Sequence, residues 1–182
     1  MKRVIIFFFI LSCVHVMAEN LNREDAIKYF EIRSQHYKSA VLTGRYVKKN
    51  IYTVINLCWE ETTKDDLKYL QLFPELETIH LSSAIQIKDK DLEFISNLPK
   101  LRILNLDNTM ITGEGFKYLN NLPSLKEINL SATRVTDANL QELKKFKTLK
   151  NIWLYKSKVT QKGVDMLQKE LPGCFISLKP QD

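Results

Sequence analysis

The sequence predicts an α/β solenoid, in which short parallel strands stack into one sheet and helices cover its other side. A pattern of aliphatic residues returns about every 24 residues, in units that begin near residues 52, 76, 101, 125, 149 and 173. Within a unit, a stretch of alternating apolar and polar residues precedes a stretch with helical spacing. A fixed period of this length is typical of stacked repeats, which bury their apolar edges only against neighbouring units.

Four units carry the strand pattern in full, with aliphatic residues at their first, fourth and sixth positions. They are LETIHLSSA from Leu76, LRILNLDNT from Leu101, LKEINLSAT from Leu125 and LKNIWLYKS from Leu149. A weaker copy begins at Tyr52, and a truncated one begins at Gly173. Alternation such as Leu104, Asn105, Leu106 predicts a strand with one buried face, and in-register parallel strands would make a sheet whose inner face is the core.

Turns and helices are expected after each strand. A hydroxylated residue follows the strand, where its side chain can bond the backbone of the turn. Three residues later, a threonine stands where a helix N-cap belongs. The turn residues are Thr109, Thr133 and Ser157, and the expected caps are Thr112, Thr136 and Thr160. One extra residue in the second unit falls at residues 84–88, where we expect a bulged loop.

The string L-x-x-L-x-L-x-x-T-x-I-T from Leu101, followed by G-F-x-x-L-x-x-L-P from Gly115, resembles a leucine-rich repeat. The resemblance covers residues 50–180, within an expected repeat domain of residues 50–182. It is to the helix-bearing, ribonuclease-inhibitor-like type, as a small secreted bacterial member. It implies a right-handed solenoid with the parallel sheet on the concave face and helices on the convex face. It also implies a protein-binding scaffold, although such a fold does not name its ligand.

Residues 1–18 resemble a signal peptide. Lys2 and Arg3 precede an apolar run at residues 4–14, and Ala18 ends a small-residue cleavage site. The run is shorter than the roughly 20 residues that span a bilayer, and no later segment approaches that length. We therefore expect a secreted or periplasmic protein. In the alternative interpretation, Cys13 in the string I-L-S-C is lipidated and the protein is a lipid-anchored surface adhesin.

Residues 19–49 lack the repeat and are expected to form a helical N-terminal cap. Asn22 can cap a helix whose first turn contains Glu24 and Asp25. Ala26 and Phe30 lie on its apolar face. A terminal repeat needs such a cover because its outer side otherwise exposes the core.

Beyond the predicted signal peptide, the chain has two cysteines, Cys58 and Cys174. The register places them on the first and last rungs, five strand spacings apart. At about 4.8 Å for each spacing they are roughly 24 Å apart, whereas a disulfide requires Cα atoms within about 7 Å. We therefore expect two thiols.

The charge of the chain is uneven. The formal net charge is +6, and from Asn139 onward nine lysines face four acidic residues. Such a basic end would suit an acidic partner; the alternative is a solvated lysine-rich helix face. Nucleic acid is not an expected partner, because this half has no arginine and no nucleic-acid-binding motif.

The strand register also predicts a binding surface on the concave face. The residues that flank the buried positions are mostly small and polar, but the last two rungs display Trp153, Tyr155 and Phe175, and the last also displays Ser177. Exposed aromatic residues on a rigid surface are frequent binding anchors. The alternative is that they close the end of the core. The predicted partner-binding residues are Trp153, Tyr155, Phe175, Asn151, Glu127, Asn129, Asn105, Asp107 and His80.

Catalytic motifs are scarce. The sequence has no Cys-x-x-Cys, His-Glu-x-x-His, Gly-x-Ser-x-Gly or glycine-rich phosphate loop. It therefore predicts neither a metal nor a cofactor, and no enzymatic activity. The alternative is a thiol-dependent enzyme that uses Cys58, His80 and Asn105, which the register places on successive rungs of the same face.

Overall fold

The structure is a computed structural model that describes residues 22–37, 42–43, 52–58 and 60–180. The predicted signal peptide at residues 1–18, its cleavage site after Ala18 and the alternative lipid site at Cys13 lie outside the described residues. Within the described ranges, no helix is long and apolar enough to cross a membrane.

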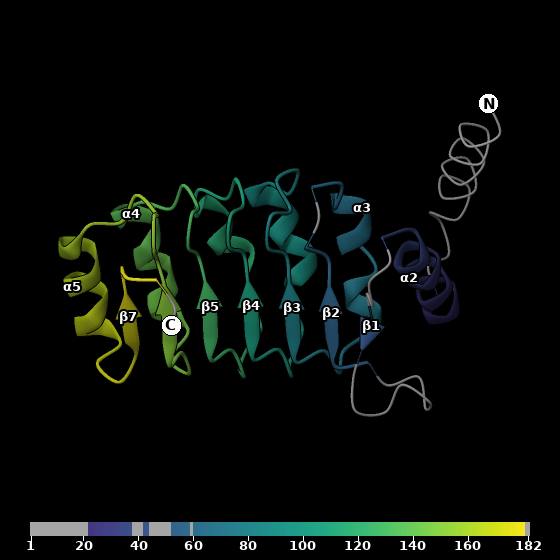
Figure 1. The fold of residues 1–182 in the computed structure, drawn as a ribbon. Helices are drawn as coiled ribbons and strands as arrows, with labels where there is room; N and C mark the ends of the chain where they lie inside the picture. Colours follow the sequence, from purple (N-terminus) through teal and green to yellow (C-terminus); the bar gives the residue numbers. More distant parts are fainter. Residues whose placement is uncertain (1–21, 38–41, 44–51, 59, 181–182) are drawn as a thin grey trace.

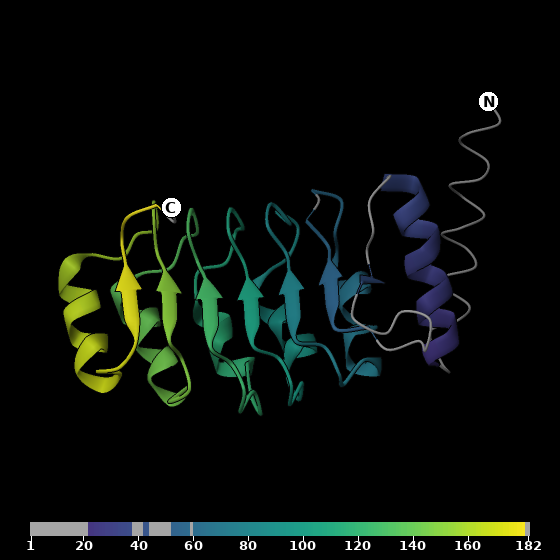
Figure 2. The ribbon, with the colours of Figure 1, turned by 60° about the horizontal axis from the view of Figure 1, so that its bottom comes forward.

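The centre of the molecule is one sheet of seven strands, whose order in space is their order in the chain (Figures 1 and 2). Strands β2 to β7 are parallel, and β1 pairs antiparallel with β2. The strands are β1 (Leu42–Thr43), β2 (Val54–Asn56), β3 (Thr78–His80), β4 (Ile103–Asn105), β5 (Glu127–Asn129), β6 (Asn151–Trp153) and β7 (Phe175–Ser177). The predicted α/β solenoid is therefore confirmed, and β1 is an addition that the repeat pattern does not contain.

A column of aliphatic side chains runs through the stack. The central residue of each strand from β2 to β6 is 0% exposed, whereas its two neighbours are partly exposed. The column consists of Ile55, Ile79, Leu104, Ile128 and Ile152, which are partners in register. Burial of each such side chain contributes about 1.5–3 kcal/mol. Since each side chain is covered by those above and below it, the stabilisation depends on the stack and not on any single unit.

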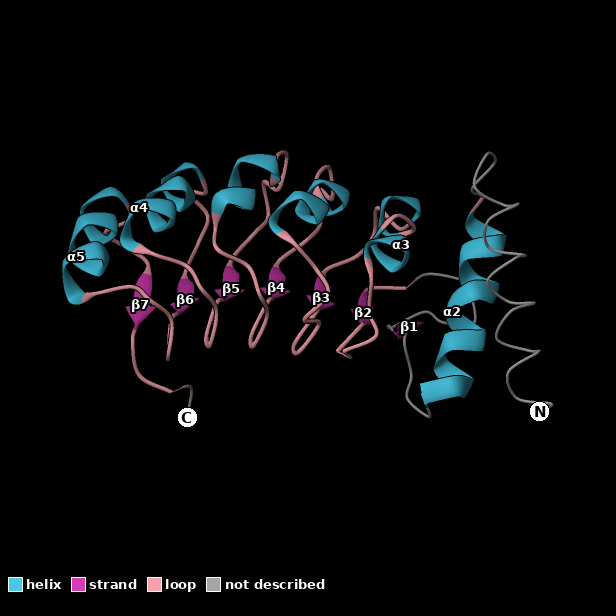
Figure 3. Ribbon diagram, turned by 90° about the horizontal axis from the view of Figure 1, so that it is seen from above, coloured by secondary structure: helices cyan, strands magenta, loops and turns pink. Residues whose placement is uncertain are grey.

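Short helices cover the convex side of the sheet (Figure 3), and most of them are 3-10 helices. They are α3 (Lys64–Leu67), η2 (Leu70–Leu72), η3 (Asp89–Ile95), η4 (Glu114–Tyr118), α4 (Asp137–Leu140), η5 (Gln141–Lys145) and α5 (Gln161–Glu170). A 3-10 helix rises about 2.0 Å per residue against about 1.5 Å for an α-helix. It therefore returns the chain to the next strand with fewer residues, which suits a short repeat.

The three threonines predicted to cap helices differ in the hydrogen bonds that their hydroxyls make. The Thr160 hydroxyl accepts from the Gly163 N–H at 3.4 Å and caps α5, as predicted. Thr136 is the N-cap residue of α4, as predicted, although its hydroxyl donates to the Asn139 side chain at 2.7 Å. The prediction is wrong for Thr112, which precedes the cap residue of η4. Both hydroxyls donate to a side-chain oxygen, that of Asp89 in the case of Thr112, and the Thr112 hydroxyl also accepts from the Glu114 N–H of η4 at 3.4 Å.

Aspartates link neighbouring units on the convex side. The Asp89 carboxylate accepts from the backbone N–H groups of Gly113 at 3.0 Å and Gly115 at 2.9 Å, one unit further on. Asp137 accepts from the Thr160 N–H at 2.7 Å in the same way. Gly115 is required here, because a Cβ at this position would lie 2.8 Å from the Cα of Asp89 and closer still to its carbonyl group.

The turns after the strands largely agree with the prediction. The hydroxyls of Thr109 and Thr133 are buried and donate to the carbonyls of Leu106 and Leu130 at 2.7 and 2.6 Å. Ser157 instead accepts from a backbone N–H two residues later, at 3.3 Å. The extra residue of the second unit is accommodated by two consecutive turns over residues 81–87.

Helix α2 (Arg23–Tyr37) covers the N-terminal side of the sheet (Figure 1). Asn22 caps it, since its side-chain oxygen accepts from the Asp25 N–H at 3.0 Å. Phe30 is 1% exposed and packs against Phe73, with ring centroids 6.1 Å apart. The apolar face of the helix thereby closes the outer side of the first unit.

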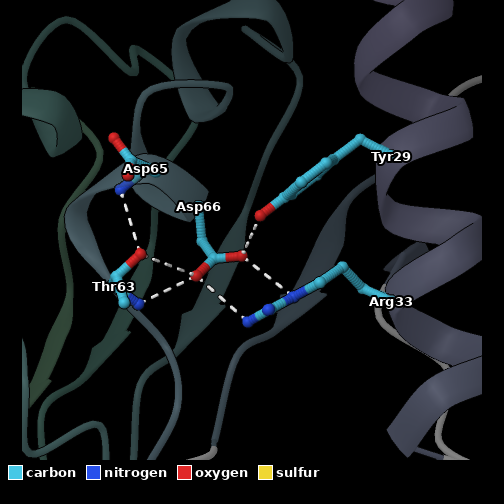
Figure 4. Close-up of polar contacts among 5 residues, drawn as sticks. All are labelled: Tyr29, Arg33, Thr63, Asp65 and Asp66. Carbon is cyan, nitrogen blue, oxygen red and sulfur yellow. Dashed lines mark hydrogen bonds and ion pairs between the residues drawn. The ribbon is translucent and has the colours of Figure 1, made fainter. Parts of the chain in front are cut away.

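A buried carboxylate fastens this helix to the first unit (Figure 4). Asp66 accepts from the Tyr29 hydroxyl at 2.7 Å and from the Thr63 N–H at 2.8 Å. The Arg33 guanidinium lies 3.0 Å from the same carboxylate. Burial raises the pKa of Asp66, while Arg33 and the hydrogen bonds oppose that increase. Two α2 side chains therefore converge on one residue of α3.

Candidate functional site

The concave face of the sheet presents parallel rows of side chains, because every strand is in register with the next. One row contains Asn56, His80, Asn105, Asn129, Trp153 and Ser177. The row beside it contains Val54, Thr78, Ile103, Glu127, Asn151 and Phe175. The predicted partner-binding residues of the strands therefore do lie on one face, and Asp107 and Tyr155 lie two residues beyond the ends of β4 and β6.

Two of the predicted binding residues also hold turns. The side-chain oxygens of Asn105 and Asn129 accept from the backbone N–H groups of Asp107 and Ser131, each at 2.9 Å. These bonds fix the chain as it leaves the strand. The recurrence of asparagine two residues before the turn was visible in the sequence and could have indicated this role. Trp153 occupies the equivalent position in β6, and an indole has no acceptor that could make such a bond.

Trp153, Tyr155 and Phe175 form what we call the aromatic patch, at the C-terminal end of this face. The rings of Trp153 and Phe175 meet edge to face, with centroids 5.4 Å apart and an interplanar angle of 67°. Phe175 is 55% exposed, and Trp153 and Tyr155 are partly exposed. The ammonium group of Lys156 lies 5.2 Å from the centroid of the Tyr155 ring, within the range of a cation–π contact. The patch thus combines apolar area with positive charge.

The last rung departs from the prediction in one respect. Ser177 was expected on the displayed face, but it is only 9% exposed and accepts from the Lys179 N–H at 3.1 Å. The chain turns directly after β7 and covers this serine. Phe175 therefore provides most of the exposed surface of β7.

Burial also shifts the pKa of two predicted binding residues. It lowers the pKa of His80, which favours the neutral imidazole. It raises the pKa of Asp107 above its usual value, and a hydrogen bond from Asn108 opposes the change. Glu127 lies on the strand next to Asn151, its partner in register.

The alternative thiol site lacks the features that activate a nucleophile. Cys58 lies two residues beyond Asn56, which is the partner of His80, so the two side chains are diagonal neighbours at most. Burial raises the pKa of the Cys58 thiol despite hydrogen bonds from Ser82, whereas a nucleophilic cysteine needs a lowered pKa. Asn105 is engaged with the turn. Cys58 and Cys174 are both free thiols, as expected.

Metal sites and surface hollows are the remaining features that could hold a ligand. In the described part of the chain, no three His, Cys, Asp or Glu side chains are grouped so that they could hold a metal ion. A shallow hollow of about 700 Å³ lies between the loops that lead into β4, β5 and β6. Its lining includes Pro99, Leu122, Phe146 and Lys147. The sequence prediction did not contain this hollow, because it forms only where three loops stack.

Comparison with known proteins gives structural likenesses of low identity. The alignment with an internalin of Listeria monocytogenes covers 62% of this chain and 31% of the internalin chain, at 19% identity and a TM-score of 0.49. Internalin C2 of the same species matches 68% of this chain and 69% of its own, at 16% identity and a TM-score of 0.39. A Bacteroides fragilis protein matches 60% of this chain and 43% of its own, at 22% identity and a TM-score of 0.37. No protein-family model and no curated protein matches the chain.

Proposed function

We propose that this leucine-rich-repeat solenoid is an exported, non-enzymatic module that binds a partner protein through its concave sheet face. The aromatic patch is the anchor of that contact. In this proposal residues 1–18 are a signal peptide, residues 19–49 a cap and residues 50–182 the binding domain. The partner presents an acidic surface to the basic C-terminal half.

The observation that carries the proposal is the exposure of Phe175 beside Trp153. Phe175 is 55% exposed although its ring packs against Trp153 at 5.4 Å. Large exposed aromatic side chains held on a rigid sheet supply apolar area at little cost in conformational entropy, and they dominate binding energy at many interfaces. The neighbouring polar residues Asn151 and Glu127 would form the hydrogen-bonding rim of such a contact.

The alternative, that the aromatic residues only close the end of the core, has less support. Leu167 and Leu171 of the α5 segment belong to the last buried layer and are 0% and 4% exposed. A side chain whose main role is to close the core should be mostly buried as these are, whereas Phe175 is 55% exposed.

The test is affinity capture with three baits, each beginning at Glu19. The first is the unchanged chain, the second carries Trp153→Ala and Phe175→Ala, and the third carries Met166→Ala as a control, so that no variant changes the net charge. Met166 is 46% exposed on helix α5, away from the concave face. We expect the unchanged chain and the Met166 variant to capture the same protein and the double variant to lose it, with all three folded by circular dichroism. Identical capture by all three baits would refute the proposal.

A further inference from the structure

A row of basic side chains follows the edge of the sheet at which the strands begin. Arg102, Lys126 and Lys150 stand one residue before β4, β5 and β6, and all three are exposed. Backbone hydrogen bonds join them: the Lys126 N–H donates to the Arg102 carbonyl at 2.9 Å, and the Lys150 N–H to the Lys126 carbonyl at 2.7 Å. Three cationic side chains therefore leave consecutive rungs, about 4.8 Å apart.

The loops that lead into these strands add to the positive charge. Residues 97–102, 119–127 and 144–150 contain seven basic residues and one acidic residue, Glu127. The Lys145 ammonium donates to the Phe116 carbonyl at 2.7 Å, and that of Lys147 to the Glu170 carbonyl at 3.3 Å. A carbonyl positions an ammonium group without neutralising it. Lys145 and Lys147 also line the 700 Å³ hollow described above. We call Arg102, Lys126, Lys145, Lys147 and Lys150 the basic rim.

Most of this charge is uncompensated. Among the ion pairs of the described residues, only one involves the basic rim, between Arg102 and Glu77 at 3.7 Å. Within the described part of the chain, no carboxylate lies within ion-pair distance of the four lysines, although Glu142 acts on Lys145 at longer range. A row of like charges on a rigid edge produces a positive potential that attracts and orients an acidic ligand.

The basic rim is continuous with the aromatic patch. The Phe175 N–H donates to the Lys150 carbonyl at 2.7 Å, so the last rim residue and the most exposed aromatic residue lie on hydrogen-bonded neighbouring segments. Lys150 also directly precedes the strand that contains Trp153. A ligand anchored on the aromatic patch would therefore reach the basic rim without crossing another element.

We propose that the basic rim binds an acidic, extended segment of the partner protein whose main body contacts the concave face, an inference that rests on the function proposed above. The cations are spread along a line and do not converge on one point, so they suit a chain of negative charges better than a single small anion. In an extended peptide, side chains on one face recur about every 6.8 Å, which is close enough to the rung spacing for flexible lysines to follow. A symmetric dimer through two basic rims is disfavoured by the repulsion between them.

The test uses a fluorescein-labelled decaglutamate peptide, whose binding is followed by fluorescence anisotropy at about 20 mM and about 200 mM salt. The rim variant carries Lys126→Glu and Lys150→Glu. The control carries Lys162→Glu and Lys169→Glu, which make the same change in net charge at exposed positions of α5. We expect the unchanged chain to bind at low salt and weaken at high salt, and the rim variant to bind at least about tenfold more weakly. Equal weakening by both variants, or no binding by the unchanged chain, would overturn the proposal.

Two further measurements distinguish binding of an acidic segment at the basic rim from binding at the concave face and from binding of a polysaccharide. The Trp153→Ala/Phe175→Ala variant adds no charge and should bind decaglutamate as the unchanged chain does. Failure of the partner capture alone would therefore refute the concave-face proposal and leave the basic rim intact. Dextran sulfate serves as a second probe. Binding of dextran sulfate without binding of decaglutamate would show a polysaccharide surface and would overturn the acidic-segment proposal.

Discussion

Removal of the Asp66 carboxylate tests how the N-terminal helix is held. The side chain is 1% exposed and accepts from the Tyr29 hydroxyl, the Thr63 N–H and Nη2 of Arg33 at 2.7–3.1 Å. In Asp66→Ala the Tyr29 hydroxyl and the Thr63 N–H lose their acceptor, which costs about 1–3 kcal/mol for each donor that remains buried. Breaking a buried ion pair costs about 3–5 kcal/mol, but the Arg33 side chain is 19% exposed and regains some hydration. We therefore expect a loss of about 3 kcal/mol in the free energy of unfolding.

Urea denaturation, followed by circular dichroism, measures this loss. The matched control is Asp65→Ala, because Asp65 is the preceding residue but its side chain is 48% exposed and paired with Lys68 at the surface. Exposed pairs contribute about 0–1 kcal/mol, so the control should change little. If Asp66→Ala and Asp65→Ala destabilised the protein equally, the description of Asp66 as the fastening point of α2 would be refuted.

Two further perturbations test the packing between units. Gly115→Ala should destabilise the protein by about 2 kcal/mol through overpacking against Asp89, whereas Gly173→Ala, where a Cβ has nothing within 4 Å, should be nearly neutral in thermal unfolding; comparable effects would contradict the close contact. Burial raises the pKa of Cys174 from 9.0 to about 11. Its contribution to stability should therefore be present below pH 9 and be lost as pH rises to about 11, and Cys174→Ser should remove that part of the pH dependence of urea unfolding; an unchanged profile would contradict it.

The stacked sheet could be predicted from the sequence because its signal repeats. Leu104 and its equivalents return at a fixed period, so each strand supports the assignment of the others. The helix type could not be predicted in this way. Buried pairs such as Leu92 and Ile95, or Phe116 and Leu119, are three residues apart, and that spacing fits one turn of either a 3-10 or an α-helix. Strand β1 has two residues, too few to leave any periodic pattern.

The sequence predicted those features of the candidate site that follow from the strand register, namely which residues share the concave face. Placing Trp153 and Phe175 on neighbouring rungs required only the repeat length. The hydrogen bonds of Asn105 and Asn129 and the Asp66 cluster depend on turn geometry and on contacts between distant segments. The basic rim was missed because lysines were counted along the sequence, whereas Lys126 and Lys150 become neighbours only when the units are stacked.

The proposed function requires the partner to contact the aromatic patch. Photo-crosslinking tests it most directly, with benzoylphenylalanine introduced at position 175 or, as the control, at position 166 on α5, whose native side chains are 55% and 46% exposed. After irradiation with the captured partner, we predict a covalent adduct from position 175 and none from position 166. An adduct from position 166 alone, or equal adducts from both positions, would contradict the claim.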